Sequence, residues 1–134
     1  MSDDNAMSSN GREEGRQADR AGRPVSFLIG WGIPLLAVLA TSFLAIPMWV
    51  ITLVWVAGFA WMGIGCVLNA RRCGRRHCFY SGPVLLLGAI AVALVGSEVV
   101  SLGPHGFVIV VWSTFALVLL TFVPEWIGGK YVRR

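Results

Sequence analysis

Long apolar stretches separated by short polar segments dominate the pattern of this chain. No charged residue occurs between Pro24 and Ala70, and this run is longer than the roughly 20 residues that one transmembrane helix needs. Pro47 divides the run, because proline lacks a backbone donor and disfavours helix in the residue before it. We therefore predict two helices here, at about 27–44 and about 48–68.

Two more apolar stretches follow a polar island. The first, "GPVLLLGAIAVALVGSEVV", opens with a Gly-Pro pair that favours a helix start and predicts a helix at about 83–100. The second, "GFVIVVWSTFALVLLTFVPEW", follows the turn-forming "LGPHG" and predicts a helix at about 106–124. No stretch shows the alternation of a transmembrane strand. The predicted fold is an all-α membrane protein with four transmembrane helices in two helical hairpins.

Composition and charge extend this prediction to an orientation. Hydrophobic residues make up 56% of the chain and charged residues 13%, which is far from the balance of a soluble protein. All Lys and Arg residues lie before the first helix (Arg12, Arg16, Arg20, Arg23), between the second and third (Arg71, Arg72, Arg75, Arg76) or after the fourth (Lys130, Arg133, Arg134). Four helices place these segments on one side, which the positive-inside rule assigns to the cytoplasm. We expect an inner-membrane protein with both termini cytoplasmic.

This topology divides the chain into three regions. Residues 1–24 are polar, mix both signs of charge and contain no aromatic residue, which predicts a disordered cytoplasmic tail. Residues 25–127 should form the four-helix transmembrane domain, with a cytoplasmic loop at 69–82. Residues 128–134 should form a basic cytoplasmic tail.

Cysteines and arginines are concentrated in the predicted loop. Its segment "NARRCGRRHC" contains Cys73 and Cys78, and Gly74 between them allows the chain to fold back and bring both sulfurs together. His77 adds an imidazole beside Cys78. Cys66 lies near the end of the second helix, two helical turns before Cys73, so the two would share a face if that helix continued.

These residue types favour thiol or metal chemistry. The arginines around Cys73 are expected to lower its thiol pKa from the usual value near 8.5, which raises the thiolate fraction at neutral pH. A reducing cytoplasm disfavours a structural disulfide. Thiolates and imidazole suit Hg(II), Cu(I) or Zn(II). The candidate metal ligands are Cys73, Cys78, His77 and Cys66, and the sequence implies no other cofactor.

A second interpretation gives the loop no metal. Clustered arginines at a membrane surface attract anionic lipid headgroups, and the cysteines are then incidental small residues. The protein would be a non-catalytic structural or accessory membrane subunit whose basic loop docks anionic lipid or a membrane or cytoplasmic protein. The contact residues would be Arg71, Arg72, Arg75 and Arg76.

The loop resembles that of the bacterial mercuric-ion transport proteins, which are small inner-membrane proteins with a cysteine pair between the second and third helices. Cys73 and Cys78 match that pair. The resemblance implies binding of Hg(II), which the family passes between cysteine pairs. The family's other pair, in the first helix, has no counterpart in "SFLIGWGIPLLAVLATSFLA". The resemblance therefore extends to a cytoplasmic receiving site and not to uptake.

Within the helices, the polar candidates are few. Glu98 lies near the outer end of the predicted third helix, where an intramembrane acid is a functional candidate. It could pair with His105 across the outer turn or simply reach the headgroups. Small residues, including Gly63 and Gly65, predict close helix packing, and the tryptophans are expected to anchor helix ends in the membrane.

Enzyme and nucleic-acid functions are not expected. The sequence has no Ser-His-Asp set, no glycine-rich phosphate loop and no paired intramembrane carboxylates. The basic residues should lie against a membrane and have no aromatic platform on which bases could stack. The sequence thus predicts a small membrane protein that handles a soft metal ion as a transporter or accessory, or the accessory subunit described above.

Overall fold

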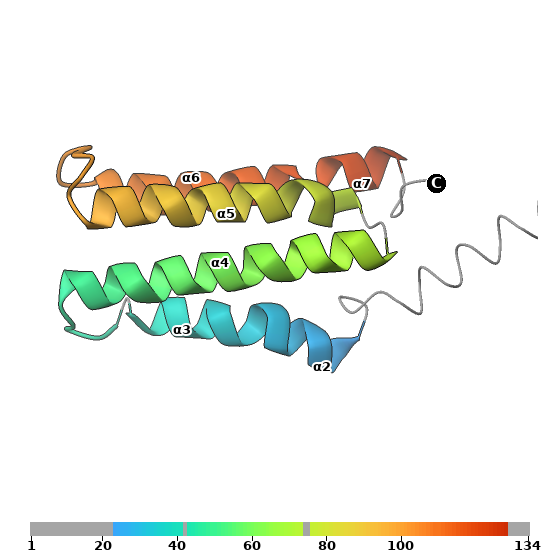
Figure 1. The fold of residues 1–134 in the computed structure, drawn as a ribbon, viewed down its shortest axis with the longest axis horizontal. Coiled ribbons are helices and arrows are strands. Elements are labelled where there is room, and N and C mark those ends of the chain that lie inside the picture. Colours follow the sequence, from blue (N-terminus) through green and yellow to red (C-terminus); the bar gives the residue numbers. More distant parts are fainter. Residues whose placement is uncertain (1–22, 42, 74–75, 129–134) are drawn as a thin grey trace, which may run out of the picture.

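The structure is a computed structural model that describes residues 23–41, 43–73 and 76–128. Four helical passes lie side by side and run alternately in opposite directions (Figure 1). Their elements are α2 (Pro24–Phe27), η2 (Leu28–Gly32), α3 (Ile33–Thr41), α4 (Met48–Cys73), α5 (Arg76–Gly96), α6 (Gly106–Leu120) and α7 (Val123–Gly128). The all-helical prediction is confirmed, with no strand among the described residues. The predicted tails lie outside these residues, except for their edges at Arg23–Pro24 and Gly128.

Three passes are long and apolar enough to cross a membrane, and the fourth is shorter. The three are Pro24–Thr41, with 18 residues, α4 and α5. α6 has 15 residues and rises by roughly 22 Å, less than the ~30 Å of a bilayer's hydrocarbon core. α7 begins only three residues after α6 ends and continues in nearly the same direction (Figure 1).

The first pass begins and ends three residues earlier than predicted, and its middle is a π-helix. The backbone N–H of Ile33 donates to the carbonyl of Leu28, a bond that closes the wider π turn. The cause lies at Pro34, which has no N–H to donate to the carbonyl of Gly30 and whose ring would clash with it in a regular α-helix. The wider turn removes this conflict.

The prediction of a loop at 69–82 is wrong, because helices cover almost all of this segment. α4 continues to Cys73 and α5 begins at Arg76, so Pro83 lies inside α5 instead of opening it. Arginine is a good helix former, and a cation in the last turn of α4 complements the helix dipole. The proline removes only one bond, to the carbonyl of Phe79.

The ends of the third and fourth passes also differ from the prediction. α5 ends at Gly96, and α6 ends at Leu120 instead of near 124. Pro124 explains the second difference, because it cannot donate to the carbonyl of Leu120. Thr121 ends α6 with N–H bonds of 3.1 Å to the carbonyls of Leu117 and Val118.

An aromatic cluster around Trp55 joins three of the passes. The Trp55 ring packs edge to face against Phe59 of its own helix and against Phe107 and Phe115 of α6, with ring centroids 5.6 to 6.2 Å apart. Its indole N–H donates to the hydroxyl of Thr41 on α3, 3.1 Å away. Trp55 is therefore a buried core residue, and its predicted role as a membrane anchor is wrong.

Glycines bring α4 and α5 into close contact, as the sequence predicted for Gly63. A Cβ added at Gly63 would lie 2.9 Å from Cγ of Leu86 and 3.1 Å from the carbonyl oxygen of Gly82. A Cβ at Gly82 would in turn lie 3.3 Å from the carbonyl oxygen of Gly63. Gly65 does not share this role, because nothing lies within 4 Å of its added Cβ.

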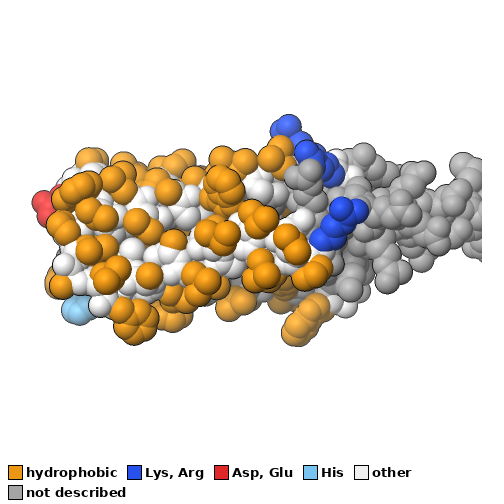
Figure 2. Space-filling model, turned by 90° about the horizontal axis from the view of Figure 1, so that it is seen from below, with side chains coloured by type: hydrophobic (Ala, Val, Ile, Leu, Met, Phe, Trp, Pro, Cys, Tyr) orange, Lys and Arg blue, Asp and Glu red, His pale blue; other side chains and the backbone are white. Residues whose placement is uncertain are grey.

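The surface of the bundle is apolar along its length and charged at its ends. Figure 2 shows hydrophobic side chains over the length of the visible face, with Lys and Arg side chains at one end and acidic and histidine side chains at the other. The described arginines lie where the first pass begins, α4 ends and α5 begins: Arg23, Arg71, Arg72 and Arg76. We call this the arginine end. Glu98 and His105 lie in the turn at the opposite end.

Paired substitutions in α4 test the close contact. We expect Gly63→Ala to lower the free energy of unfolding by about 1–3 kcal/mol, because the methyl group overpacks the interface with α5. Gly65→Ala meets open space and should be neutral or stabilising by up to about 1 kcal/mol, since it removes a flexible glycine from a helix. Thermal unfolding in detergent micelles measures both, and equal effects would contradict the packing described here.

Candidate functional site

Two buried thiols meet near the arginine end of the bundle. Cys66 of α4 and Cys78 of α5 are each 2% exposed and both are free thiols. The two side chains lie near each other and line the same cavity. They are adjacent because Cys66 lies about one turn from Gly63, and Cys78 about one turn from Gly82, on the same side of the glycine contact. Their closeness therefore follows from the packing of α4 on α5.

Polar side chains surround the sulfur of Cys78. The side-chain amide of Asn69 donates to this sulfur at 3.7 Å, and Nε2 of His77 lies 3.3 Å from it. Both Asn69 and His77 are buried. The His77 ring stacks on Phe122, with centroids 4.6 Å apart and planes 17° apart, so the imidazole is held in place beside the thiol.

The hydroxyl of Ser81 is a buried polar group without a hydrogen bond among the described residues. Ser81 is fully buried in α5, one turn after Cys78, and its hydroxyl lies close to the Cys66 thiol. Burying an unsatisfied hydroxyl is costly, and such groups often mark the place of a water molecule or an ion. The thiol pair therefore has a further oxygen donor beside it.

The structure brings together Cys66 and Cys78, two of the four predicted ligands, whereas the predicted pair of Cys73 and Cys78 lies partly outside what the structure describes. Of the predicted ligands, Cys66 lies beside Cys78 and His77 lies beside Cys78, but the three do not form one ligand set. The side chain of Cys73 is not among those that the structure describes. α4 does continue to Cys73, as sharing a face with Cys66 would require. In the part of the chain that the structure describes, no three His, Cys, Asp or Glu side chains are arranged to hold a metal ion.

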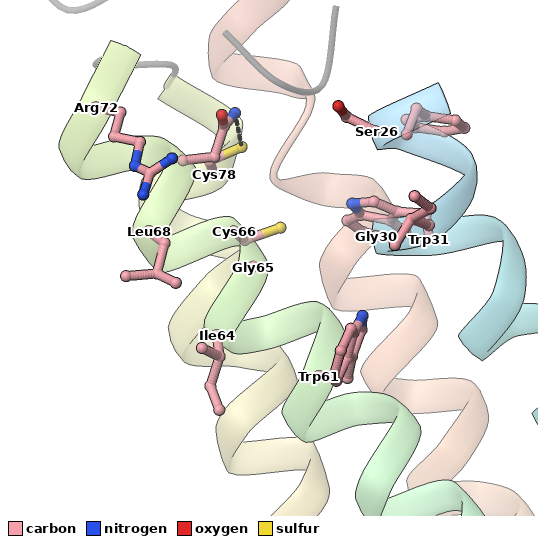
Figure 3. A pocket seen from close by; sticks show the side chains of 13 residues that line it. Ser26, Gly30, Trp31, Trp61, Ile64, Gly65, Cys66, Leu68, Arg72 and Cys78 are labelled. Atoms are coloured by element: carbon pink, nitrogen blue, oxygen red, sulfur yellow. Dashed lines mark hydrogen bonds between the residues drawn. The ribbon is translucent and has the colours of Figure 1, made fainter. Parts of the chain in front are cut away.

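A cavity of about 460 Å³ opens beside the thiols, between the first pass and α4. Both Cys66 and Cys78 line it, and Figure 3 shows the Cys66 sulfur pointing toward the wall that carries Gly30 and Trp31. Trp61 lies on the α4 wall (Figure 3). The cavity gives an ion or small molecule a route to the otherwise buried sulfurs.

Three of the predicted lipid-contact arginines lie at the arginine end, near this site. Arg71 and Arg72 are exposed at the end of α4, and Arg72 also lines the cavity. Arg76 is half-buried in the first turn of α5. Arg75 lies outside the described residues.

The sequence predicted Glu98 inside the third helix, and this prediction is wrong. Glu98 lies two residues after α5 ends, is exposed, and has a φ of 60°, which is the left-handed region that few non-glycine residues adopt. Its backbone N–H donates to the carbonyl of Val95. The structure shows no hydrogen bond or ion pair between the described side chains of Glu98 and His105. Glu98 thus forms part of a turn at the end opposite the thiols.

Sequence reasoning missed Asn69, Ser81 and the cavity. A signal for the disturbed turn that borders the cavity was Pro34 in "GWGIP", because a proline inside a helix lacks an N–H and clashes with the carbonyl four residues earlier. Asn69 and Ser81 lay inside the predicted loop, and only the observed helices place them on the inner faces of α4 and α5.

Comparison of the chain with protein-family models, with curated proteins and with solved structures gave no match.

The burial of the thiols predicts slow alkylation. In a Cys73→Ser variant, Cys66 and Cys78 should react with a bulky maleimide in mild detergent on the order of tenfold more slowly than after denaturation in SDS, because buried cysteines are inert. Mass spectrometry of the labelled protein measures the rates. The control is Cys66→Ser/Cys78→Ser, which reports the rate of Cys73 alone. Equal rates in mild detergent and SDS would show that the thiols are not buried.

Proposed function

We propose that this chain is an inner-membrane protein that binds a soft metal ion at its cytoplasmic end through Cys66 and Cys78. The observation that carries the proposal is the convergence of two free thiols from different helices. Such convergence is not needed for helix packing, which small apolar residues achieve equally well. Deprotonated thiols are the ligands that soft cations prefer.

The geometry favours ions that accept few ligands. Two thiolates suffice for linear coordination of Hg(II) or Cu(I), whereas a structural Zn(II) site requires four ligands in a tetrahedron. His77 beside Cys78 and the unsatisfied Ser81 hydroxyl would complete the surroundings of the ion. The resemblance to mercuric-ion transport proteins was carried by Cys73 and Cys78, and of that pair only Cys78 belongs to the site proposed here.

The proposed role is that of a receiving or accessory protein at the cytoplasmic face. The cavity offers the ion an approach to the sulfurs, and binding would release the thiol protons. The first pass supplies no cysteine for a second relay point, so the site receives or holds an ion instead of carrying it across. If no metal binds, the accessory-subunit interpretation takes its place.

The proposed orientation has both termini in the cytoplasm and four transmembrane passes. Its support is the apolar surface of the bundle between two polar ends and the gathering of the described arginines at one of them. Positive charge of this kind is retained on the cytoplasmic side. α6 and α7 together supply the fourth pass.

Reporter fusions test the orientation. The segment after Arg134 should lie in the cytoplasm and His105 outside it, because the positive-inside rule places the arginine end in the cytoplasm. A fusion after Arg134 should therefore show only the activity of a cytoplasmic reporter, and an insertion at His105 only that of an external reporter. Alkaline phosphatase and green fluorescent protein fusions, which are active on opposite sides, provide the measurement. Phosphatase activity of the fusion at Arg134 would contradict the proposed number of passes.

Metal binding to the purified protein tests the site. After dialysis against an excess of a monothiol, which removes Hg(II) or Cu(I) from a single cysteine such as Cys73, we expect the wild type to retain one ion per chain and Cys66→Ser/Cys78→Ser to retain none, because serine does not replace a thiolate as a soft ligand. Binding should weaken as the pH falls, since protons compete for the thiols. Elemental analysis after dialysis gives the stoichiometry.

Cys73→Ser is the matched control for this measurement. It removes a thiol from the same end of the bundle and should leave the stoichiometry unchanged. Loss of metal binding in Cys73→Ser, together with retention in the double variant, would show that Cys73 is the metal ligand. Equal metal uptake by the wild type and the double variant would contradict a metal site at Cys66 and Cys78.

A further inference from the structure

We propose that the cavity between the first pass and α4 binds one anionic phospholipid from the surrounding leaflet. One acyl chain would occupy the apolar part of the cavity, and the lipid phosphate would lie at Arg72. This inference rests on the membrane placement proposed above, and it uses Arg72 and the apolar walls of the cavity instead of the thiols.

The walls of the cavity fit an acyl chain. Its volume of about 460 Å³ falls within the ~300–1,000 Å³ typical of small-molecule sites. Large apolar side chains from both walls line it: Phe27, Ile29 and Trp31 from the first pass and Trp61, Ile64 and Leu68 from α4. Several of these remain half exposed, with Trp61 at 60% and Ile64 at 52%. The cavity is thus an apolar cleft that is accessible from the side of the bundle.

The polar side chains of the cavity lie toward the arginine end. Figure 3 shows Ser26 and Arg72 at one end of the cavity and Trp61 and Ile64 toward the other. None of the described lining residues is acidic, and Glu98 lies at the opposite end of the bundle. A cation at the membrane surface attracts an anionic headgroup, and arginine binds phosphate through its planar fork of donors. The cavity therefore matches the charge pattern of an anionic lipid.

The backbone of the first pass is built around this space. The π-helix η2 contributes Ile29, Gly30 and Trp31 to the lining, and π segments often occur at functional sites. Gly30 and Gly65 face the cavity from opposite walls, and a Cβ added at either would meet nothing within 4 Å. These glycines keep open a volume that larger side chains would fill.

Lipid retention by the full chain tests the proposal. The protein is purified in micelles containing equal amounts of phosphatidylglycerol and phosphatidylcholine with identical acyl chains, and native mass spectrometry counts the retained lipids. The wild type should retain one phosphatidylglycerol in preference to phosphatidylcholine. Arg72→Gln should reduce this preference about fivefold, the effect expected of one basic residue at a membrane surface.

Two matched pairs of variants separate the cavity from general effects. Arg71→Gln removes a neighbouring exposed charge that does not line the cavity and should leave most of the preference intact. Gly65→Leu should abolish retention of both lipids by filling the cavity, whereas Ala57→Leu, at an exposed position of α4 outside the cavity, should retain them. Circular dichroism and the thermal midpoint establish that each variant is folded.

Several results would overturn the proposal. They are equal retention of the two lipids by the wild type, equal effects of Arg71→Gln and Arg72→Gln, and retention of phosphatidylglycerol by folded Gly65→Leu. Displacement of the lipid by glycerol phosphate would show that a free phosphate compound suffices. Loss of self-association in Gly65→Leu without loss of lipid would assign the cavity to a second copy of the chain.

A final variant distinguishes this proposal from the proposed function. Arg72→Gln should bind Hg(II) as the wild type does even though its phosphatidylglycerol preference is reduced, because arginine is not a ligand of soft metal ions. Loss of Hg(II) binding in folded Arg72→Gln would show that the two proposals describe one site. Failure of metal binding in the wild type would leave the lipid result unaffected.

Discussion

The close approach of α4 and α5 at Gly63 and Gly82 is the constraint on which the candidate site depends. Two helices can come together this closely only where side chains are absent from the contact. Because the helices are antiparallel, residues about one turn from the contact on the same side also face each other. This is how Cys66 and Cys78 come to share a buried site, although the residues between them had been expected to form a loop.

A second contact holds the opposite end of the bundle. Trp55 packs against aromatic rings of α6 and donates a hydrogen bond to Thr41 of α3, so one side chain connects the first, second and fourth passes. Aromatic pairs of this geometry add about 0.5–1.5 kcal/mol each beyond the area they bury. The Trp55 cluster thus fixes the first pass near its end at Thr41, while the beginning of the same pass borders the cavity.

The cavity owes its existence to this unequal packing of the first pass. Val38 of α3 packs against Gly58 of α4, but no described side chain lies within 4 Å of a Cβ added at Gly30 or Gly65, nearer the arginine end. The π turn imposed by Pro34 lies at the transition between the packed and unpacked parts. Metal and lipid are proposed to approach the same end of the bundle, where Cys66 and Arg72 both line the cavity, but they would use different atoms.

The sequence by itself determined the helical class, the division into four apolar helical segments and the gathering of the described arginines at one end. These follow from local quantities, namely the length of apolar runs, the positions of proline and the placement of arginines. It did not determine the helix ends around Cys73 and Pro83, because apolar periodicity stops where polar residues begin even if the backbone continues as a helix. Only the tertiary structure decided that Cys66 partners Cys78, that Asn69 and Ser81 face inward, and that a cavity lies beside them. These features depend on the rotation and spacing of α4 against α5 and the first pass, which are set by contacts between residues distant in sequence.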